Sequence, residues 1–395
     1  MISFDEAIGV IGQAARPLGS ERTKLDQAAE RALAAPVVAA IDSPRADVSA
    51  MDGYAVRGDD LGSYPISLKL IGESVPGSGW DGIVEPGQCV RIFTGAPLPA
   101  GAERIVIQER VHRDGDVAII EADPGPATWV RPRGKDFKAG DEILPASRLL
   151  DPAALIAAAG ADAREVDVYF RPRIVLLSNG DELVEPGKAR ASSLAVPDSA
   201  SLGVTALAER WGAQVVDRHC LPDNLNRMEA AARAAVEAGD LVVVIGGASV
   251  GERDFAKAMF EPLSLELLFS RISIRPGKPA WFGRVGQTLV MGLPGNPTSA
   301  LVTARLLLSP LLAAMQGRPP GQALDWEPAW LSSPLPACDQ RETFHRATLA
   351  NGVVAPVDFQ ESHAQRALAE ANVLIRQPAN SGPMPKDKEV MVLRV

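Results

Sequence analysis

The start of the chain shows two patterns of apolar residues with helical spacing. Apolar side chains recur from Phe4 to Ile11, and Ser3 and Glu6 have the spacing of a capping box. A similar pattern predicts a second helix over Lys24–Ala34. We therefore expect the chain to begin with a helical or mixed region.

From residue 46 the pattern changes to short apolar runs separated by glycine and proline, which is typical of short β-strands. Four such runs are Ile66–Ile71, Cys89–Phe93, Ile105–Gln108 and Val117–Ile120. Helical spacing returns at Ala153–Ala159, after Pro152 at the first helical position. The sequence predicts a β-rich domain over residues 46–139, inserted into a helical and mixed N-terminal domain of residues 1–45 and 140–170.

Residues 171–317 alternate between strand and helix patterns, as a doubly wound sheet does. The run Leu241–Ile245 is apolar throughout, as expected of a parallel strand covered by helices on both faces. These patterns predict an αβα domain. Its strands are expected at Ile174–Leu177, Gln214–Val216, Leu241–Ile245 and Thr288–Met291, and its helices at Ser201–Trp211, Arg227–Glu237 and Thr298–Ala314.

A proline-rich linker at Gly317–Pro334 precedes the last part of the chain. Four apolar runs follow it, at Arg341–Leu349, Val353–Val357, Val373–Arg376 and Glu389–Val395. They predict a small C-terminal β domain, similar to a barrel, over residues 318–395. The expected fold class is therefore multi-domain α/β plus β.

The charge balance argues against a nucleic-acid or membrane partner. The 395 residues include 40 Lys and Arg against 49 Asp and Glu, a net charge of −9, which repels polyphosphate chains and anionic membranes. The apolar stretch Ala300–Met315 is interrupted by Arg305 and Pro310, so we expect no membrane span. Three distant cysteines and a start without a signal pattern indicate a reducing cytoplasm.

Three loops after predicted parallel strands are rich in glycine and polar residues: Ser178–Glu182, Gly246–Asp254 and Gly292–Pro297. Ligands of open α/β sheets bind beyond the carboxyl ends of the strands, so we expect these loops to converge on one site. Gly246 and Gly247 let the backbone approach a ligand, and successive N–H groups can hold an oxyanion. An ordinary strand-to-helix turn would use the same glycines.

Charged residues in and beside these loops suit an anionic ligand and a metal. Asp181, Glu182 and Asp254 offer hard oxygen ligands for Mg²⁺, although single carboxylates more often cap helices. Arg275 and Lys278 lie in a proline-stiffened loop that could clamp a tetrahedral oxyanion, although surface cations are more often simply solvated. The histidines fall outside these loops, so neither a Ser-His-Asp triad nor a histidine metal site is supported.

Taken together, these strings resemble the molybdopterin molybdenumtransferase family, which includes bacterial MoeA proteins and the E domain of gephyrin. The resemblance covers nearly the whole chain, and several independent motifs occur in the order that the family has. The matching segments are Ser49–Arg57, Arg91–Gly101, Arg133–Gly140, Ser178–Leu183, Gly246–Phe255, Arg275–Pro279 and Gly292–Ala300.

The resemblance implies a specific reaction and assembly. The reaction would be the Mg²⁺-dependent insertion of molybdate into adenylylated molybdopterin, with release of AMP. The protein would be a homodimer whose cleft lies between the αβα domain of one subunit and the β insertion of the other. Further implied partners are the molybdopterin adenylyltransferase that supplies the substrate and the molybdoenzymes that accept the product.

The resemblance also assigns site residues, position by position. Mg²⁺ and pyrophosphate chemistry would fall to Asp181, Glu182 and Asp254, with Asp52 completing the catalytic set from the partner subunit. The implied substrate-binding residues, which would cradle the pterin nucleotide, hold molybdate or line the cleft, are Gly246, Gly247, Ser249, Asp198, Thr94, Arg275, Lys278, Pro294, Asn296, Ser299, Arg341 and Ser362.

The chain departs from the family pattern at several of these places. Asn179 stands where the family usually has Thr, and Arg275 replaces a Lys. The segment Pro197–Ala200 keeps the Asp of a Tyr-Asp-Ser/Thr-Asn string but lacks its aromatic and its amide residue. Two alternatives to the transferase therefore stay open. One is a non-catalytic molybdopterin-binding or scaffold paralogue, and the other is a different phosphoanhydride hydrolase on the same αβα domain.

Overall fold

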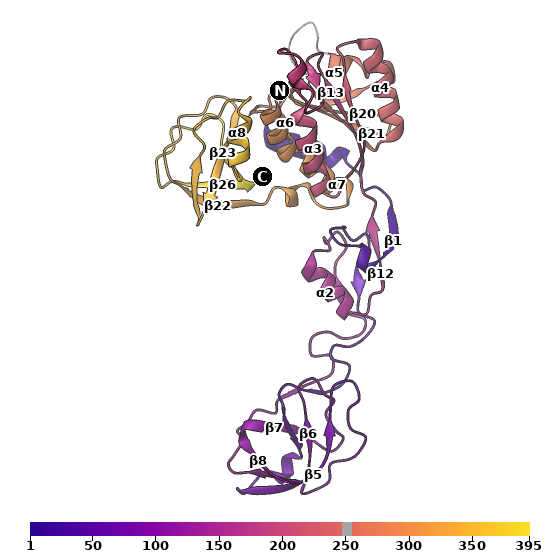
Figure 1. Ribbon diagram of the computed structural model, residues 1–395, viewed down its shortest axis with the longest axis vertical. Coiled ribbons are helices and arrows are strands. Elements are labelled where there is room, and N and C mark those ends of the chain that lie inside the picture. The colour runs from indigo at the N-terminus through magenta and orange to yellow at the C-terminus, as the bar shows by residue number, and fades with distance from the viewer. Residues whose placement is uncertain (247–254) are drawn as a thin grey trace. The chain divides into compact units, whose positions relative to one another are not determined.

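The computed structural model describes residues 1–246 and 255–395 (Figure 1). The chain divides into two compact units. The first consists of Met1–Glu21, Glu30–Ala34 and Val168–Val395, and the second of Arg22–Ala29 and Ala35–Asp167. The chain passes between them within strands β1 (Ser20–Lys24) and β12 (Glu165–Tyr169), and also after Ala29 and after Ala34.

A six-stranded sheet forms the centre of the first unit. Its first four strands are parallel, and the last two are antiparallel to their neighbours. This arrangement confirms the predicted doubly wound domain. In sheet order the strands are β16 (Gln214–Leu221), β13 (Arg173–Asn179), β17 (Leu241–Ile245), β21 (Thr288–Leu293), β20 (Trp281–Val285) and β18 (Glu266–Phe269).

Helices cover both faces of this sheet, because alternate residues of β17 enter two different hydrophobic cores. Leu241 and Val243 join one core and Val242 and Val244 join the other, which explains why this strand is apolar throughout. The first core contains α1 (Phe4–Ala14), α3 (Ser199–Arg210), α6 (Pro297–Thr303) and α7 (Ser309–Met315), and the second contains α4 (Leu225–Ala238) and α5 (Phe255–Ala258).

The prediction of a second helix over Lys24–Ala34 is wrong. The structure has the end of β1 there, followed by a 3₁₀ helix at Leu25–Gln27. Glu30 has a left-handed backbone conformation (φ 59°), which interrupts any helix through this segment. The capping box at Ser3 and Glu6 is present, and the helix it begins packs in the core of the first unit.

The last predicted helix of the αβα domain is interrupted. A π-helical segment at Ala304–Leu308 separates α6 from α7. In a regular α-helix, the N–H group at position 310 would donate to the carbonyl group four residues earlier. Pro310 has no N–H group, and a π-helical turn accommodates the missing hydrogen bond. The stretch Pro297–Met315 is long and apolar enough to cross a membrane, but 94% of its most apolar window is buried, so it is a core helix.

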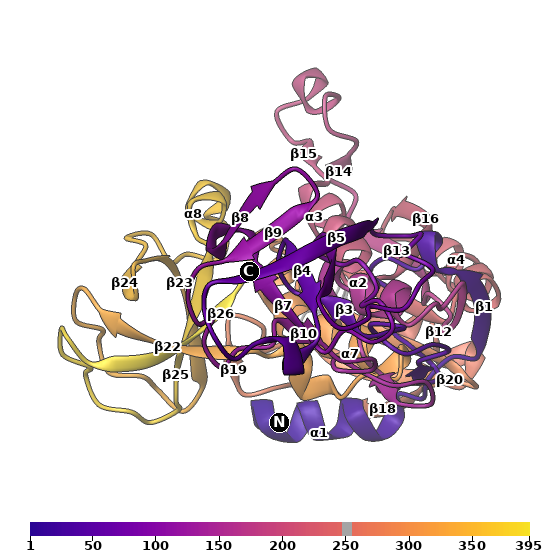
Figure 2. The ribbon, with the colours of Figure 1, turned by 90° about the horizontal axis from the view of Figure 1, so that it is seen from below.

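The C-terminal strands form a closed barrel, as predicted. Strands β23, β24, β22, β26 and β25 pair in succession, and a further pairing of β23 with β25 closes the ring. A short helix, α8 (Gln365–Glu370), lies beside β23 (Figure 2). The strands are β22 (Trp326–Leu331), β23 (Glu342–Ala350), β24 (Val353–Pro356), β25 (Val373–Gln377) and β26 (Glu389–Arg394).

The barrel and the αβα domain share one hydrophobic core. Phe344 of the barrel contacts Phe4 of α1 edge to face, with ring centroids 5.1 Å apart. Arg376 of the barrel donates to Asp5 and Glu342, which ties α1 to β23 and β25. In addition, the two-residue strand β19 (Ile274–Arg275) leaves the αβα domain and pairs in parallel with β23. The position of Arg275 is therefore fixed by both domains.

The second unit is built around its own six-stranded sheet and confirms the predicted β-rich domain. Tyr54 and Val56 enter one core and Ala55 enters another, so both faces of this sheet are covered. Helix α2 (Pro152–Gly160) begins at the predicted proline, with Asp151 as its N-cap. In sheet order the strands are β7 (Arg104–Ile107), β4 (Gly53–Val56), β6 (Gln88–Ile92), β5 (Ile66–Ser74), β9 (Val117–Ile120) and β8 (Val111–Asp114).

Short strand pairs complete the fold. In the second unit these are β2 (Val37–Val38) with β11 (Glu142–Leu144), and β3 (Val48–Ser49) with β10 (Val130–Arg131). In the first unit, β14 (Leu183–Val184) pairs with β15 (Val196–Pro197), and the segment between them projects from the sheet (Figure 2). The division into four domains at the expected boundaries stays a prediction.

Candidate functional site

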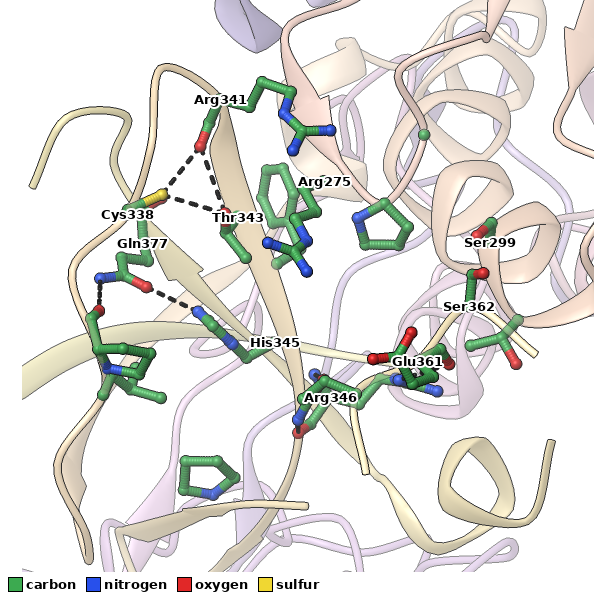
Figure 3. A pocket seen from close by; sticks show the side chains of 18 of the residues that line it. Arg275, Ser299, Cys338, Arg341, Thr343, His345, Arg346, Glu361, Ser362 and Gln377 are labelled. Carbon is green, nitrogen blue, oxygen red and sulfur yellow. Dashed lines mark hydrogen bonds between the residues drawn. The ribbon is translucent and has the colours of Figure 1, made fainter. Parts of the chain in front are cut away.

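Two cavities in the first unit contain most of the predicted site residues that the structure describes. The larger one, about 700 Å³, lies where the αβα domain meets the barrel, and we call it the barrel cavity (Figure 3). The other, about 620 Å³, lies at the carboxyl ends of the parallel strands, and we call it the strand-end cavity. Both include Pro279, Pro294 and Asn296 in their walls, so the two cavities adjoin.

The barrel cavity brings together seven residues that the sequence assigned to substrate binding: Arg275, Lys278, Pro294, Asn296, Ser299, Arg341 and Ser362. They come from separate parts of the chain, and the pairing of β19 with β23 explains how they meet. Arg275 lies opposite Thr343 in this register, two residues after Arg341. The cations of the β19 loop and the barrel therefore face the same space.

The loop after β19 is closely packed. Gly277 has φ 119°, and a Cβ atom there would lie 2.6 Å from Ile274 Cδ1 and 2.7 Å from Thr303 Oγ1. Neither the backbone conformation nor the space suits any other residue. The glycine thus lets the loop that carries Arg275 and Lys278 lie directly against α6.

The lining of the barrel cavity carries a net positive charge, with Arg275, Lys278, Arg341 and Arg346 against Asp339, Asp358 and Glu361. Arg275 and Lys278 form no ion pair within the described residues. Arg341 bonds to Asp339, with 3.0 Å between Nη2 and Oδ2, and this contact together with the Arg341 backbone N–H lowers the pKa of Asp339. Arg346 is buried, and its guanidinium donates to the backbone carbonyls of residues 359, 361 and 364. Arg346 is therefore a structural cation, whereas Arg275 and Lys278 are free to meet an anion.

One hydrogen bond links the walls of the barrel cavity. Asn296 Nδ2 donates to Ser362 Oγ over 2.9 Å, from the start of α6 to the loop before α8. Thr298 and Ser299 lie in the first turn of α6, and Thr298 Oγ1 is buried with no hydrogen-bond partner in the described part of the chain. This wall therefore offers hydroxyl and amide groups beside the cations.

The strand-end cavity confirms that the loops after the parallel strands converge, as far as they are described. A Cβ atom on Gly246 (φ 96°) would lie 2.8 Å from the carbonyl oxygen of Asn179, and one on Gly295 would lie 3.2 Å from Gly246 Cα. The ends of β13, β17 and β21 thus approach each other at glycines. Gly247, Ser249 and Asp254, which the sequence also assigned to this site, lie outside the described residues.

Two carboxylates face the strand-end cavity. Glu182 and Asp198 line it, and Asp198 Oδ1 accepts from the N–H of Ser201 at the start of α3. Burial raises the pKa of Cys220, and the charges of Asp198 and Glu182 raise it further, so both carboxylates act on this thiol. Asp181 does not line the cavity. Its Oδ1 accepts from the N–H of Asp223 over 3.0 Å.

Metal ligands are not gathered within the part of the chain that the structure describes. No group of three or more His, Cys, Asp or Glu residues there could hold a metal ion. Glu182 and Asp198 nonetheless present hard carboxylate oxygens, the donor type that Mg²⁺ prefers, on one cavity. These oxygens fit a magnesium ion in donor type, and the described residues supply only these two carboxylates to the cavity wall.

Asn179 is a departure from the family pattern that the sequence did not assign to the site, yet it lies in the site. It is 7% exposed at the end of β13 and lines the strand-end cavity. Among residues 1–246 and 255–395, neither its amide nitrogen nor its amide oxygen has a hydrogen-bond partner. A polar residue ending an otherwise apolar strand is the sequence signal that points to such a position.

His345 is a second missed residue: it lies outside the three strand-end loops, as its position in the sequence indicated, but on β23 beside the other cavity. It lines the barrel cavity, and its Nε2 lies 2.7 Å from Gln377 Oε1 (Figure 3). Burial lowers the pKa of His345, the Gln377 hydrogen bond opposes this shift, and the charge of Arg275 adds to it. Side chains alternate along a strand, so Arg341, Thr343 and His345 share a face. This spacing is the signal that could have revealed it.

Asp52 and Thr94 belong to the second unit, where they contact each other. Asp52 Oδ1 accepts from the Thr94 backbone N–H over 2.7 Å and from its hydroxyl over 2.9 Å. These bonds lower the pKa of Asp52, with the backbone bond contributing most. The pair holds the turn at Gly95, which has φ 83°.

The fold and the two adjoining cavities define a class of protein in which an αβα ligand-binding domain shares its site with a small barrel. Family models confirm this class. The "MoeA N-terminal region (domain I and II)" matches residues 2–161, the "probable molybdopterin binding domain" matches 175–314, and the "MoeA C-terminal region (domain IV)" matches 328–395. The chain belongs to the MoeA family of molybdopterin molybdenumtransferases and is an enzyme of molybdenum cofactor biosynthesis.

Relatives and solved structures agree with this assignment. The chain is 35% identical to a molybdopterin molybdenumtransferase of Haemophilus influenzae, over 95% of this chain and 94% of the relative. It is 32% identical to molybdopterin molybdenumtransferase 2 of Mycobacterium tuberculosis, with 96% of each chain covered. A molybdopterin biosynthesis MoeA protein from Pyrococcus horikosii has a similar structure, with a TM-score of 0.82, 26% identity, and coverage of 100% of this chain and 99% of the other.

Proposed function

We propose that the protein inserts molybdate into adenylylated molybdopterin in a Mg²⁺-dependent reaction that releases AMP. The observation that carries the proposal is the junction of two cavities of opposite character at Pro279, Pro294 and Asn296. A cationic cavity suits a free oxyanion, and an acidic cavity suits a phosphate ligand that arrives with a divalent cation. Joined at one wall, they would hold both substrates of a transfer reaction side by side.

Molybdate would bind in the barrel cavity. Arg275 and Lys278 would neutralise the dianion, and Arg341 would add a cation whose charge is partly offset by Asp339. Ser299 and Ser362 would donate hydroxyl hydrogen bonds to its oxygens. The guanidinium fork of Arg275 holds two oxygens of a tetrahedral anion at once, which a lysine ammonium does not do in a fixed geometry.

The pterin nucleotide would bind at the strand ends. Gly246, with Gly247 and Ser249 beyond it, would let the backbone approach the phosphates, since Gly246 already leaves no room for a side chain. Asp198, Pro294 and Asn296 would line the same site. This arrangement follows the general rule for ligands of open α/β sheets.

Magnesium would be held by Glu182 together with Asp181 and Asp254. The two carboxylates on the strand-end cavity would otherwise repel a phosphate ligand, so the acidic wall itself favours a bound cation. When bound, the metal would supply charge neutralisation at the phosphoanhydride. The protein groups would orient the phosphates and align them with the oxyanion in the adjoining barrel cavity.

The assembly and setting follow from the resemblance. We propose a homodimer in which Asp52 and Thr94 of one subunit line the cleft of the other. The enzyme that adenylylates molybdopterin would supply the substrate, and molybdoenzymes would take the product. A cytoplasmic location fits these partners and the free cysteines.

The altered segment Pro197–Ala200 favours one alternative, a binding or scaffold paralogue without turnover. Its Asp198 still lines the strand-end cavity, but Pro197 and Ala200 stand where the family has an aromatic and an amide residue. Such a protein would bind the pterin nucleotide and release no AMP.

The test is AMP release and cofactor formation by the purified protein with adenylylated molybdopterin, molybdate and Mg²⁺. Matched samples each lack one component. We expect release that needs both molybdate and Mg²⁺. Nucleotide that stays bound without turnover would support the scaffold, and AMP release that ignores molybdate would support a hydrolase; either result would contradict the transferase.

A further inference from the structure

His345 occupies a place in the barrel cavity that the proposed reaction does not yet use. Arg341, just before β23, and Thr343, Phe344, His345 and Arg346 of β23 all line the barrel cavity, and Phe344 and Arg346 are themselves buried. His345 thus projects into the same space as the cations that would hold molybdate (Figure 3).

The hydrogen bonds of Gln377 define which ring nitrogen of His345 carries the proton. Gln377 is 1% exposed, and its Nε2 donates to the carbonyl oxygen of Pro336 over 2.8 Å. A carbonyl only accepts, so the amide orientation is fixed, and Oε1 must face His345. Since Oε1 also only accepts, Nε2 of the neutral ring must carry the hydrogen and Nδ1 must carry a lone pair.

The lone pair on Nδ1 is available. Within the described residues this nitrogen has no hydrogen-bond partner, and it is not among the buried polar atoms sealed from solvent. Burial keeps the ring neutral by lowering its pKa. Within the described residues, a base without a hydrogen-bond partner on Nδ1 therefore lies in the same cavity as Arg275 and Lys278.

Charged and titratable groups surround this base from several elements. They are Arg275 and Lys278 in and after β19, Cys338, Asp339 and Arg341 before β23, Arg346 on β23 itself, and Asp358 and Glu361 in the loop after β24. Among these, Arg275 shifts the pKa of His345, and it does so downward. A proton taken up by His345 is therefore held weakly and returned readily.

The insertion of molybdate needs such a group. Molybdopterin holds molybdenum through a pair of thiol sulfurs, so two sulfur–molybdenum bonds form while one molybdenum–oxygen bond breaks. The oxygen leaves as water with the two thiol protons, and no oxidant or reductant is required. At least one proton must therefore travel from sulfur to oxygen inside the cavity.

We propose that His345 is the group that moves this proton: Nδ1 takes it from a thiol and gives it to the departing oxygen, while Gln377 holds the ring in the required tautomer. The inference rests on the proposed function, because it requires molybdate in the barrel cavity. His345 is then a catalytic residue, and Gln377 is a positioning residue.

The test compares His345→Gln, Gln377→Glu and the control His112→Gln, an exposed histidine of the second unit. Cofactor formation is measured across pH, molybdate binding is measured by calorimetry, and the melting temperature checks folding. His345→Gln should lower turnover by about 10²-fold or more, the range of general acid–base catalysis, and should abolish the acidic limb of the pH profile. Its molybdate affinity should change far less, and His112→Gln should behave as wild type.

Gln377→Glu keeps the histidine and tests the positioning role independently. A carboxylate that accepts from Nε2–H stabilises the charged ring and raises the pKa of His345, so the acidic limb should move to higher pH. This variant also decides the matter should His345→Gln fail to fold. The inference would be overturned if the acidic limb of the pH profile did not move in Gln377→Glu. It would also be overturned if His345→Gln kept wild-type turnover, or if it lost turnover and molybdate affinity equally.

The two proposals fail differently. Wild-type protein that binds molybdate and the nucleotide but forms no cofactor would refute the proposed function, and His345 would then have no reaction to serve. Wild-type protein that turns over, with a His345→Gln profile identical to it, would refute the role of His345 alone.

Discussion

The barrel cavity and the strand-end cavity adjoin but differ in charge. Arg275 and Lys278 give the first an excess of cations without carboxylate partners in the described residues, whereas Glu182 and Asp198 make the wall of the second acidic. They also differ in construction. The barrel cavity is assembled from two domains through β19 and β23, while the strand-end cavity is built from neighbouring strand ends of one sheet.

This difference teaches how one enzyme can hold two anions close together. Two like-charged ligands repel each other, so a single cationic cavity would have to offset both. With an acidic wall, the strand-end cavity would favour the proposed phosphate ligand only when a divalent cation accompanies it. The proposed oxyanion site would be occupied directly, and the nucleotide site would depend on metal.

Removal of divalent cations should give the largest effect. Chelation is expected to abolish AMP release while molybdate binding in the barrel cavity stays intact, because Arg275 and Lys278 need no metal to hold an anion. Turnover and molybdate calorimetry on the same chelated sample check this. Loss of molybdate binding on chelation would show that molybdate binding also depends on the divalent cation, which would contradict the proposed difference between the two cavities.

Glu182→Gln should come next. We expect turnover to fall by about 10²-fold, the usual cost of losing one electrostatic group at the reacting centre, with unchanged molybdate affinity. Glu185→Gln is the matched control, since Glu185 pairs with Lys188 in an exposed segment. Equal effects of the two substitutions on AMP release would remove Glu182 from the site.

Arg275→Gln should act on the other cavity. One charged hydrogen-bonding group contributes roughly 1.5 kcal/mol, so molybdate affinity should fall by about tenfold while nucleotide affinity changes little. Arg275→Lys should recover part of the loss, because it restores the charge without the planar fork. As a control, Arg284→Gln removes an exposed arginine that pairs with Glu266 away from both cavities. A fall in nucleotide affinity in Arg275→Gln would contradict the assignment of the two ligands to separate cavities.

Asn296→Ala should have the smallest effect. It removes the bond to Ser362, which contributes about 1 kcal/mol at most sites of this kind, so molybdate affinity should fall a few-fold. A double-mutant cycle with Ser362→Ala measures the coupling directly. Additive effects of the two substitutions would show that this bond does not connect the cavity walls.

The sequence could predict the elements that follow local rules. Leu241–Ile245 is apolar because both its faces are covered, and the capping box at Ser3 and the proline at 152 begin helices where expected. The convergence of the strand ends followed from the parallel sheet alone. These features need no knowledge of distant contacts.

The features it could not predict depend on distant partners. Strand β19 is two residues long and exists because β23, almost seventy positions later, pairs with it. His345 becomes a directed base only because Gln377 fixes its tautomer from another strand. The left-handed Glu30 likewise interrupts a segment whose side chains alone favour a helix.

The most direct test of the account is the location of molybdenum in crystals of the protein grown with molybdate, measured by anomalous diffraction at the molybdenum edge. We predict a peak in the barrel cavity, between Arg275, Lys278 and Arg341, that disappears in Arg275→Gln. A peak at the strand ends beside Gly246, or one in the barrel cavity that ignores Arg275, would contradict the assignment of the oxyanion to the cationic cavity.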